Sequence, residues 1–247
     1  MRKAAVVLVL ALFAGSCTTP SPPPAFADAR ALADAATAAT TSGGSAKFGT
    51  DVAVGQVRSK SQGQAKFGAG GTAQVLTTDV IGEPMEVRQV TGKLYAKVPE
   101  GSRDEVGAGK PWVAVAADGT DPFSQVLGGS LAQLAAQNDP AHTLGEIRTA
   151  GSIVSAERGQ LDGVTAEHYR VELDLSRLGT DLPAGLPPDS ALGKFPVELW
   201  LDDAHRPLQI VLDLSPILPG SEARITTRYS DWGAPVDVQP PPPGEVG

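Results

Sequence analysis

Cys17 is the only cysteine in a chain of 247 residues, so its place in the sequence calls for a chemical reason. A single cysteine cannot form a disulfide within its own chain, and the prolines and small polar residues that follow it (TTPSPPPA) exclude a buried structural role. It comes directly after a short export signal, in which Arg2 and Lys3 precede the uninterrupted apolar run Ala4–Ala14. That run is too short to span a bilayer as a permanent helix. The chemistry that remains for this thiol is covalent attachment of lipid.

The residues before Cys17, AGS at positions 14–16, resemble the lipobox of bacterial lipoproteins, in which cleavage leaves an acylated cysteine at the new N-terminus. Ala14 stands where Leu or Val is commoner. Each buried CH₂ of an acyl chain contributes roughly 0.8 kcal/mol, and stable anchoring takes more than one chain. The alternative is ordinary secretion with cleavage at the A-x-A pattern of residues 25–27, far from the apolar run. We predict a signal peptide at 1–16 and lipid anchoring through Cys17 to the outer face of the cytoplasmic membrane.

The other reactive side chains do not form a catalytic or metal-binding pattern. His142, His168 and His205 lack the spacing of metal ligands, and Cys17 has no second cysteine to join it. The stretch GAGGTA at 68–73 fits the letters of a dinucleotide-binding fingerprint. However, the strand-like AQVLTTDV follows it where that fingerprint requires a helix. We therefore predict a protein that is not an enzyme and has no cofactor and no metal.

The charge of the chain argues against two kinds of partner. It has 28 acidic and 20 basic residues, a net charge of −8, and removal of Arg2 and Lys3 with the signal peptide lowers this to −10. Binding to nucleic acid needs clustered Lys and Arg, and so does electrostatic docking on anionic lipid. We expect no nucleic-acid partner, and contact with the membrane only through the N-terminal acyl chains.

Proline-rich segments mark the boundaries of one large domain. Residues 17–27 contain TTPSPPPA, which is typical of an extended, semi-rigid tether. Residues 239–247 read QPPPPGEVG, a tail that we expect to be disordered or loosely packed as polyproline II. The segment between them, 28–238, is predicted to fold as a single domain.

This domain is dominated by the alternation of apolar and polar residues that is typical of half-buried strands. Such runs occupy residues 46–57, 83–98, 111–116, 166–175, 195–214 and 222–232. Helices are predicted over the Ala-rich residues 28–41 and after Asp121-Pro122 and Asp139-Pro140, where Asp caps a helix and Pro opens it. Most linkers are too short for the crossovers of a parallel sheet. The sequence predicts an α+β fold with a single curved antiparallel sheet of about nine to eleven strands and helices on one side.

The order of these motifs resembles the actinobacterial LppX, LprA, LprF and LprG lipoproteins, which are related in fold to LolA and LolB. The resemblance rests on the lipobox, the Ala-rich helix, and the runs AKFGTDVAV, GQAKFGAG, VTGKLYAKVP, KPWVAV, GVTAEHYRVELDL, LWLDDAHRPLQI and YSDWGAPVDV. It implies a half-barrel with helices on its concave side, enclosing an apolar cavity for an acylated glycolipid or phospholipid. It also implies a role in moving that lipid across the cell envelope with the help of a transport partner. No catalytic residues come with it.

The candidate cavity lining consists of the inward-facing apolar residues of these strands and of the central helix. They are Phe48, Val52, Val54, Met85, Val87, Leu94, Val126, Leu127, Leu131, Tyr169, Val171, Leu173, Val197, Leu199, Ile210 and Leu212. If they border open space, Val197→Trp should be tolerated and should block lipid uptake. The alternative is that the helices fill this space and the protein is an anchored, non-catalytic interaction module with a solid core.

Overall fold

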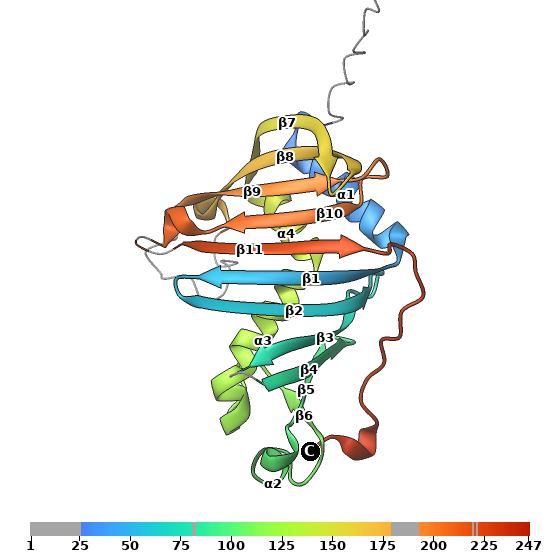
Figure 1. Cartoon of the computed structure of the whole chain (residues 1–247), viewed down its shortest axis with the longest axis vertical. Coiled ribbons are helices and arrows are strands. Elements are labelled where there is room, and N and C mark those ends of the chain that lie inside the picture. The colour runs from blue at the N-terminus through green and yellow to red at the C-terminus, as the bar shows by residue number, and fades with distance from the viewer. Residues whose placement is uncertain (1–25, 81–82, 179–192, 219, 221) are drawn as a thin grey trace, which may run out of the picture.

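The computed structural model describes residues 26–80, 83–178, 193–218, 220 and 222–247. Its main feature is a single antiparallel sheet in which the strands follow the order β6-β5-β4-β3-β2-β1-β11-β10-β9-β8-β7 (Figure 1). The strands are β1 (Ser45–Val54), β2 (Val57–Lys66), β3 (Ala73–Val80), β4 (Glu83–Val90), β5 (Lys93–Lys97), β6 (Trp112–Val115), β7 (Gly151–Leu161), β8 (Val164–Asp174), β9 (Lys194–Leu201), β10 (Pro207–Asp213) and β11 (Ala223–Ser230). The predicted α+β class and the single antiparallel sheet are confirmed.

The sheet consists of two meanders that meet in its middle. Strands β1 to β6 each pair with the next in sequence, and so do β7 to β11. The meanders are joined by antiparallel pairing of β1 with β11, which places Phe48 opposite Tyr229 and Thr50 opposite Thr227. The first and the last strand of the domain therefore lie side by side at the centre of the sheet.

The longer helices cover one face of the sheet, behind the strands in Figure 1. Helices α1 (Ala29–Gly43) and α4 (Pro140–Ala150) pack against each other and against β7 and β8, whereas α3 (Gly129–Asn138) lies against β1. The short helix α2 (Arg103–Val106) lies beyond β5 at the end of the sheet. The predicted starts are confirmed for α1 and α4, because Asp28 accepts a hydrogen bond from the Ala31 amide and Asp139 accepts one from the Ala141 amide.

The run 46–57 is not one strand. Gly55 has a φ of 56°, and the chain turns there from β1 into β2.

The strands β2 and β7 differ from the sequence prediction for another reason, which they share. Strand β2 reads VRSKSQGQAK and β7 reads GSIVSAERGQL, so neither has a clear alternation of apolar and polar residues. They are strands because their neighbours supply backbone hydrogen bonds along their whole length.

The proline-rich C-terminal segment is extended and is held against the sheet, which agrees with the packed polyproline II alternative rather than with disorder. It leaves the end of β11 and runs along one side of the sheet to the far end (Figure 1). The Gln64 side chain donates a hydrogen bond of 2.8 Å to the Asp237 carbonyl, and Val246 forms a parallel bridge with Trp112 of β6. The last residues of the chain thus pair with the outermost strand of the first meander.

Candidate functional site

The space between the sheet and the helices contains a continuous hydrophobic cluster. Most of the predicted lining residues are buried in it: Phe48, Met85, Val87, Leu94, Leu131, Tyr169, Val171, Leu173, Val197, Leu199 and Ile210. Four others, Val52, Val54, Leu127 and Leu212, are partly buried and pack against the same cluster. The structure therefore brings these residues together on the face covered by the helices. Their side chains contact one another as a packed core.

Val126 does not belong to this group, and its predicted inward position is wrong. Its residue surface is 74% exposed, although Leu131 further along the same segment is buried. The prediction assumed 3.6 residues per turn, but residues Ser124–Gly128 form a π-helical segment before α3. A π-helical turn is wider than an α-helical one and shifts the phase of the side chains. The helical stripe assumed from the sequence is therefore broken at this point.

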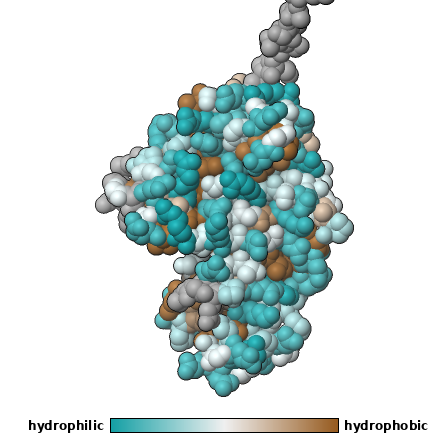
Figure 2. Space-filling model, viewed as in Figure 1, coloured by the Kyte–Doolittle hydropathy of each residue, from teal (hydrophilic) through white to brown (hydrophobic). Residues whose placement is uncertain are grey.

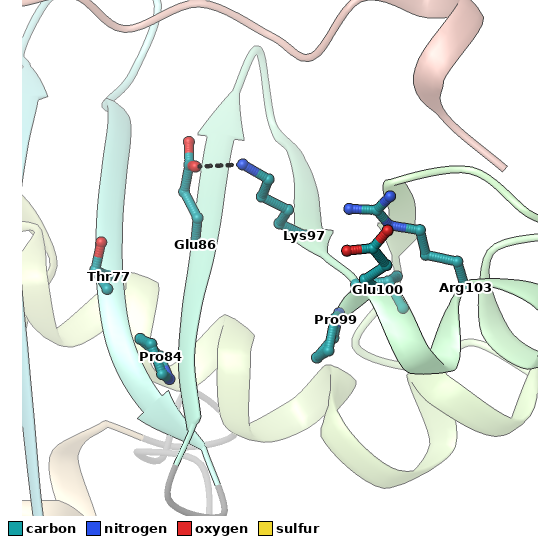
Figure 3. A pocket seen from close by; sticks show the side chains of 8 residues that line it. Thr77, Pro84, Glu86, Lys97, Pro99, Glu100 and Arg103 are labelled. Atoms are coloured by element: carbon teal, nitrogen blue, oxygen red, sulfur yellow. Dashed lines mark ion pairs between the residues drawn. The ribbon is translucent and has the colours of Figure 1, made fainter.

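Two hollows lie on the face of the sheet opposite α1, α3 and α4, the larger one beside the short helix α2. The larger, about 640 Å³, is lined by Thr77, Pro84, Glu86, Lys97, Val98, Pro99, Glu100 and Arg103 (Figure 3). The smaller, about 440 Å³, is lined by Gly49, Thr50, Asp51, Lys60, Ser61, Gln62, Thr77, Thr78, Asp79 and Arg228. Charged and polar side chains predominate in both, and the face seen in Figure 2 is largely hydrophilic. None of the predicted lining residues borders either hollow.

The interior is divided into two regions that differ in polarity. In the region beneath α1 and α4, called here the α4 half, large apolar side chains are almost completely inaccessible. They include Leu32, Leu144, Ile147, Tyr169, Phe195 and Leu199, each at most 1% exposed. In the region where α3 covers β1 to β3, the α3 half, inward positions are occupied by polar residues as well. These are Thr50, Ser61, Gln74, Thr78 and Asn138, each less than 9% exposed.

Hydrogen bonds connect the polar residues of the α3 half to the last turn of α3. Thr50 Oγ1 donates to Asn138 Oδ1 at 2.6 Å and lies 2.9 Å from Thr227 Oγ1. The Tyr229 hydroxyl donates to the Asn138 carbonyl at 3.2 Å. Burial raises the pKa of Tyr229 well above its ordinary value, with a smaller contribution from the charge of Asp139, so the phenol stays neutral.

A second set of hydrogen bonds lies about one helical turn earlier along α3. Gln74 Nε2 donates to the Ala135 carbonyl at 2.7 Å and to Gln89 Oε1 at 2.8 Å. Sequence reasoning missed these buried polar residues because it treated only apolar side chains as inward. The signal was present: Thr50 has the same strand parity as Phe48, and Gln74 the same parity as Leu76.

Glu146 is an acidic side chain buried in α4. Its residue surface is 8% exposed, and its Oε1 lies 3.6 Å from His142 Nε2 without forming a hydrogen bond. Burial raises the pKa of Glu146 from the ordinary 4.5 to about 7, because the charged form loses hydration. Helix α4 therefore carries a carboxyl group that titrates near neutral pH.

The histidines are separate from one another. The His168 ring stacks on Trp200 with 4.0 Å between ring centroids, and His205 packs edge-on against Phe26. In the described part of the chain, no three His, Cys, Asp or Glu side chains are grouped so as to hold a metal ion. Residues 68–72 form a turn that leads into β3 rather than a helix, as predicted.

The predicted anchor, Cys17, lies outside the described residues. Among the helices that the structure describes, none combines the length and the apolar character needed to cross a bilayer.

Comparison of the sequence with family models and with curated proteins gives no match. Comparison of the structure with solved structures does. The lipoprotein LppX of Mycobacterium tuberculosis superposes with a TM-score of 0.50 at 16% identity, and the match covers 85% of this chain and 98% of that one. The chain has the LppX fold.

LprF from Mycobacterium bovis matches over 86% of this chain and 96% of its own, with 16% identity and a TM-score of 0.48. A LolA superfamily protein from Nitrosomonas europaea matches over 83% of this chain and 92% of its own, with 11% identity and a TM-score of 0.34. The resemblance to LppX that was predicted from the order of sequence motifs is thus confirmed in the arrangement of the sheet and helices.

Proposed function

We propose that the protein is a cell-envelope lipoprotein, anchored through acylated Cys17, that binds an acylated lipid between its sheet and helices and assists its transport. The observation that carries this proposal is the apolar interior of an LppX-like sheet, covered on one face by helices. Acyl chains are stabilised in such an environment at about 25 cal/mol for each Å² of apolar surface removed from water. The protein acts as a carrier and not as a catalyst.

We place the ligand in the α3 half of the interior. Helix α4 buries Leu144, Ile147 and Ala150 completely, whereas α3 presents only Leu131, Ala135 and Asn138 as a buried stripe. Displacement of α3 would therefore uncover less apolar surface than displacement of α4. Of the predicted lining residues, Phe48 and Leu131 lie in this half and would contact the acyl chain. Tyr169, Val171, Leu173, Val197 and Leu199 support the fold from the α4 half, and Met85, Val87 and Leu94 do so from β4 and β5, beyond β3.

The segment before α3 supplies a place at which the helix can move. Residues Ser124–Gly128 are π-helical, and short π-helical segments are frequent at functional sites. Gly128 lies against the backbone that directly follows β6, since a Cβ at this position would be 2.2 Å from the Ala116 carbonyl oxygen. This contact fixes the start of α3, so that movement of the helix would pivot there. A lipid could then enter beneath the helix without disturbing the α4 half.

The second candidate function is that of an anchored interaction module with a solid core. Its specific support is the side-chain packing of the interior, together with the two polar hollows on the face opposite α1, α3 and α4. In that case an envelope partner would contact the exposed sheet, and no lipid cargo would be bound.

Native mass spectrometry of the full chain, expressed with its own leader and released in mild detergent, separates the two candidates. A carrier retains a lipid that is not covalently attached and that leaves on collisional activation. The matched variant Cys17→Ala should lose the covalent acyl mass and the incorporation of labelled fatty acid but keep the non-covalent lipid. Wild-type protein that never carries a non-covalent lipid would favour the interaction module. Equal labelling of both proteins, or no labelling of wild type, would refute the anchor.

A further inference from the structure

We infer that a group of buried polar side chains beneath the end of α3 binds an uncharged hydroxyl or ester group of the lipid. The group consists of Thr50, Ser61, Asn138 and Thr227 and is called here the polar cluster. This inference rests on the proposed function, because it assigns a subsite within the same interior. The inference specifies the chemical group of the lipid that is recognised and the protein atoms that recognise it.

The polar cluster forms a row across the middle of the sheet. The C-terminal end of α3 covers this row. Thr227 of β11, Thr50 of β1 and Ser61 of β2 are directly opposite one another in neighbouring strands. Side chains in such positions have Cβ atoms about 4.5–5.5 Å apart. Asn138, the last residue of α3, reaches the same row through its 2.6 Å hydrogen bond from Thr50. Four polar side chains from four elements therefore meet in one buried place.

Two atoms of the polar cluster lack a hydrogen-bond partner among the described residues. Asn138 Nδ2 and Ser61 Oγ are both inaccessible to solvent and unpaired, in residues that are 0% and 7% exposed. Exchanging the oxygen and nitrogen of the Asn138 amide does not help, because only one of the two atoms faces Thr50 in either orientation. Buried polar groups in native proteins are nearly always paired. The geometry therefore indicates that a partner is missing from this place.

Gln74 of β3 adds a third buried polar atom without a partner, at an earlier position along α3. Its Nε2 is held by the Ala135 carbonyl, so its Oε1 is the acceptor, and this oxygen is buried without a partner. Ala135 precedes Asn138 by three residues, which corresponds to about 4.5 Å along a helix. The space between α3 and the sheet thus presents the amide donor of Asn138 and the hydroxyl of Ser61 at the end of the helix, and the acceptor of Gln74 about one turn earlier.

The chemistry of these atoms selects a neutral ligand group. None of the residues of the polar cluster is ionisable, so a phosphate or carboxylate placed there would lose its hydration without gaining an opposite charge. An ester carbonyl can accept from Asn138 Nδ2, and a hydroxyl can pair with Ser61 Oγ. Acylated glycerols and acylated sugars carry both groups close to their acyl chains. We assign the polar cluster to such a neutral, hydroxyl-bearing acyl ester.

The test compares two fluorescent probes on the full-length protein and three variants. The first probe is a diacylglycerol with one pyrene-labelled chain, which has ester and hydroxyl groups. The second is a pyrene-labelled alkane, which has neither. Ser61→Ala and Asn138→Leu alter the polar cluster, and Ser152→Ala, at an exposed position of β7, is the matched control. Each altered residue should weaken diacylglycerol binding about three- to tenfold, the effect of one hydrogen bond, and leave alkane binding unchanged.

Other outcomes overturn the inference in distinguishable ways. If wild type binds both probes and the variants change neither affinity, lipid binding stands but the polar cluster does not recognise the ligand. If wild type binds neither probe, the proposed function itself fails. Thermal unfolding without ligand supplies an independent measurement. Because Ser61 Oγ is unpaired, Ser61→Ala should not lower the melting temperature, whereas a clear decrease would indicate a buried structural water in place of a ligand subsite.

Discussion

The α4 half and the α3 half of the interior lie against the same sheet but differ in the side chains that they bury. In the α4 half, α1 and α4 enclose apolar side chains such as Leu144 and Leu199, which are 0% exposed, together with the buried carboxyl of Glu146. In the α3 half, a single helix covers hydroxyl and amide groups, several of them unpaired. Complete apolar burial stabilises a fold, whereas unpaired buried groups cost free energy until they find a partner. The α4 half is dominated by apolar burial, which stabilises the fold, whereas three unpaired polar atoms of the described residues gather in the α3 half, where we propose that the ligand binds.

The packing of α1 against α4 explains why the α4 half is closed. Helix α1 is rich in alanine, and Ala33 and Ala36 are 0% exposed, so the two helices can approach each other closely. Among the described residues, α3 packs against α4 less extensively than α1 does, although α1 also contacts β1. The closer packing of α1 against α4 thus accounts for the difference between the two regions.

The largest expected effect comes from truncating a side chain in the α4 half. Leu199→Ala should lower the free energy of unfolding by about 4 kcal/mol, because a completely buried leucine leaves a cavity that rigid neighbours cannot fill. Leu131→Ala, in the α3 half, should cost about 2 kcal/mol, since a movable helix can close on the gap. Chemical denaturation of both variants measures the difference. Equal losses would contradict the distinction between the halves.

Titration of Glu146 should produce the next largest effect. Its pKa is raised to about 7 in the folded protein from an ordinary 4.5, so the folded state holds the proton more tightly than the unfolded state. Stability should therefore fall as pH rises from 4.5 to 7, by an amount on the order of 3 kcal/mol. Glu146→Gln should remove this loss, so that the variant is more stable than wild type at pH 8 and similar at pH 4. Urea denaturation at both pH values provides the measurement, and parallel pH profiles would show that this carboxyl is not responsible.

Val197→Trp should destabilise the protein by about 2 kcal/mol, in the range of overpacked cores. The sequence alone led us to expect tolerance, but Val197 is 0% exposed and lies in the packed α4 half. Val126→Trp is the matched control, because this valine is 74% exposed and a larger side chain there meets solvent. Melting temperatures of the two variants decide the matter. An unchanged melting temperature for Val197→Trp would mean that the α4 half contains space for a large side chain, and therefore for a ligand.

The smallest effect is expected for the ion pair between α1 and α4. Arg148 Nε lies 2.6 Å from Asp34 Oδ1, but both side chains are 53% exposed. Exposed pairs of this kind contribute about 0.2–1 kcal/mol and weaken with salt. Arg148→Ala should therefore change the free energy of unfolding by less than about 1 kcal/mol, as measured by denaturation in low and high salt. A larger loss would mean that charge, and not apolar packing, closes the α4 half.

The sequence predicted the parts of this molecule in which one physical rule dominates. Strict alternation located β8 and β9, and Asp-Pro located the start of α4. Prediction failed where tertiary contacts decide. The polar β2 is a strand because of its neighbours, Val126 is displaced by a π-helical turn, and Thr50 is inward despite its hydroxyl. The buried polar atoms most concern the proposed site. Strand parity with Phe48 and Leu76 places Thr50 and Gln74 on the inner face, but the sequence does not show that their polar atoms lack partners.

The pairing of the first strand with the last has a consequence for how the domain assembles. Thr50 and Thr227 contact each other across the centre of the sheet although they are 177 residues apart in sequence. During synthesis, the first meander can form early, but the inner edge of β1 has no partner until β11 has been made. Contacts between distant parts of a chain slow folding, because the entropy of closing the loop is lost before they form. We expect the central seam to close last, so that an incomplete chain remains an open half-sheet that a chaperone or a protease can recognise.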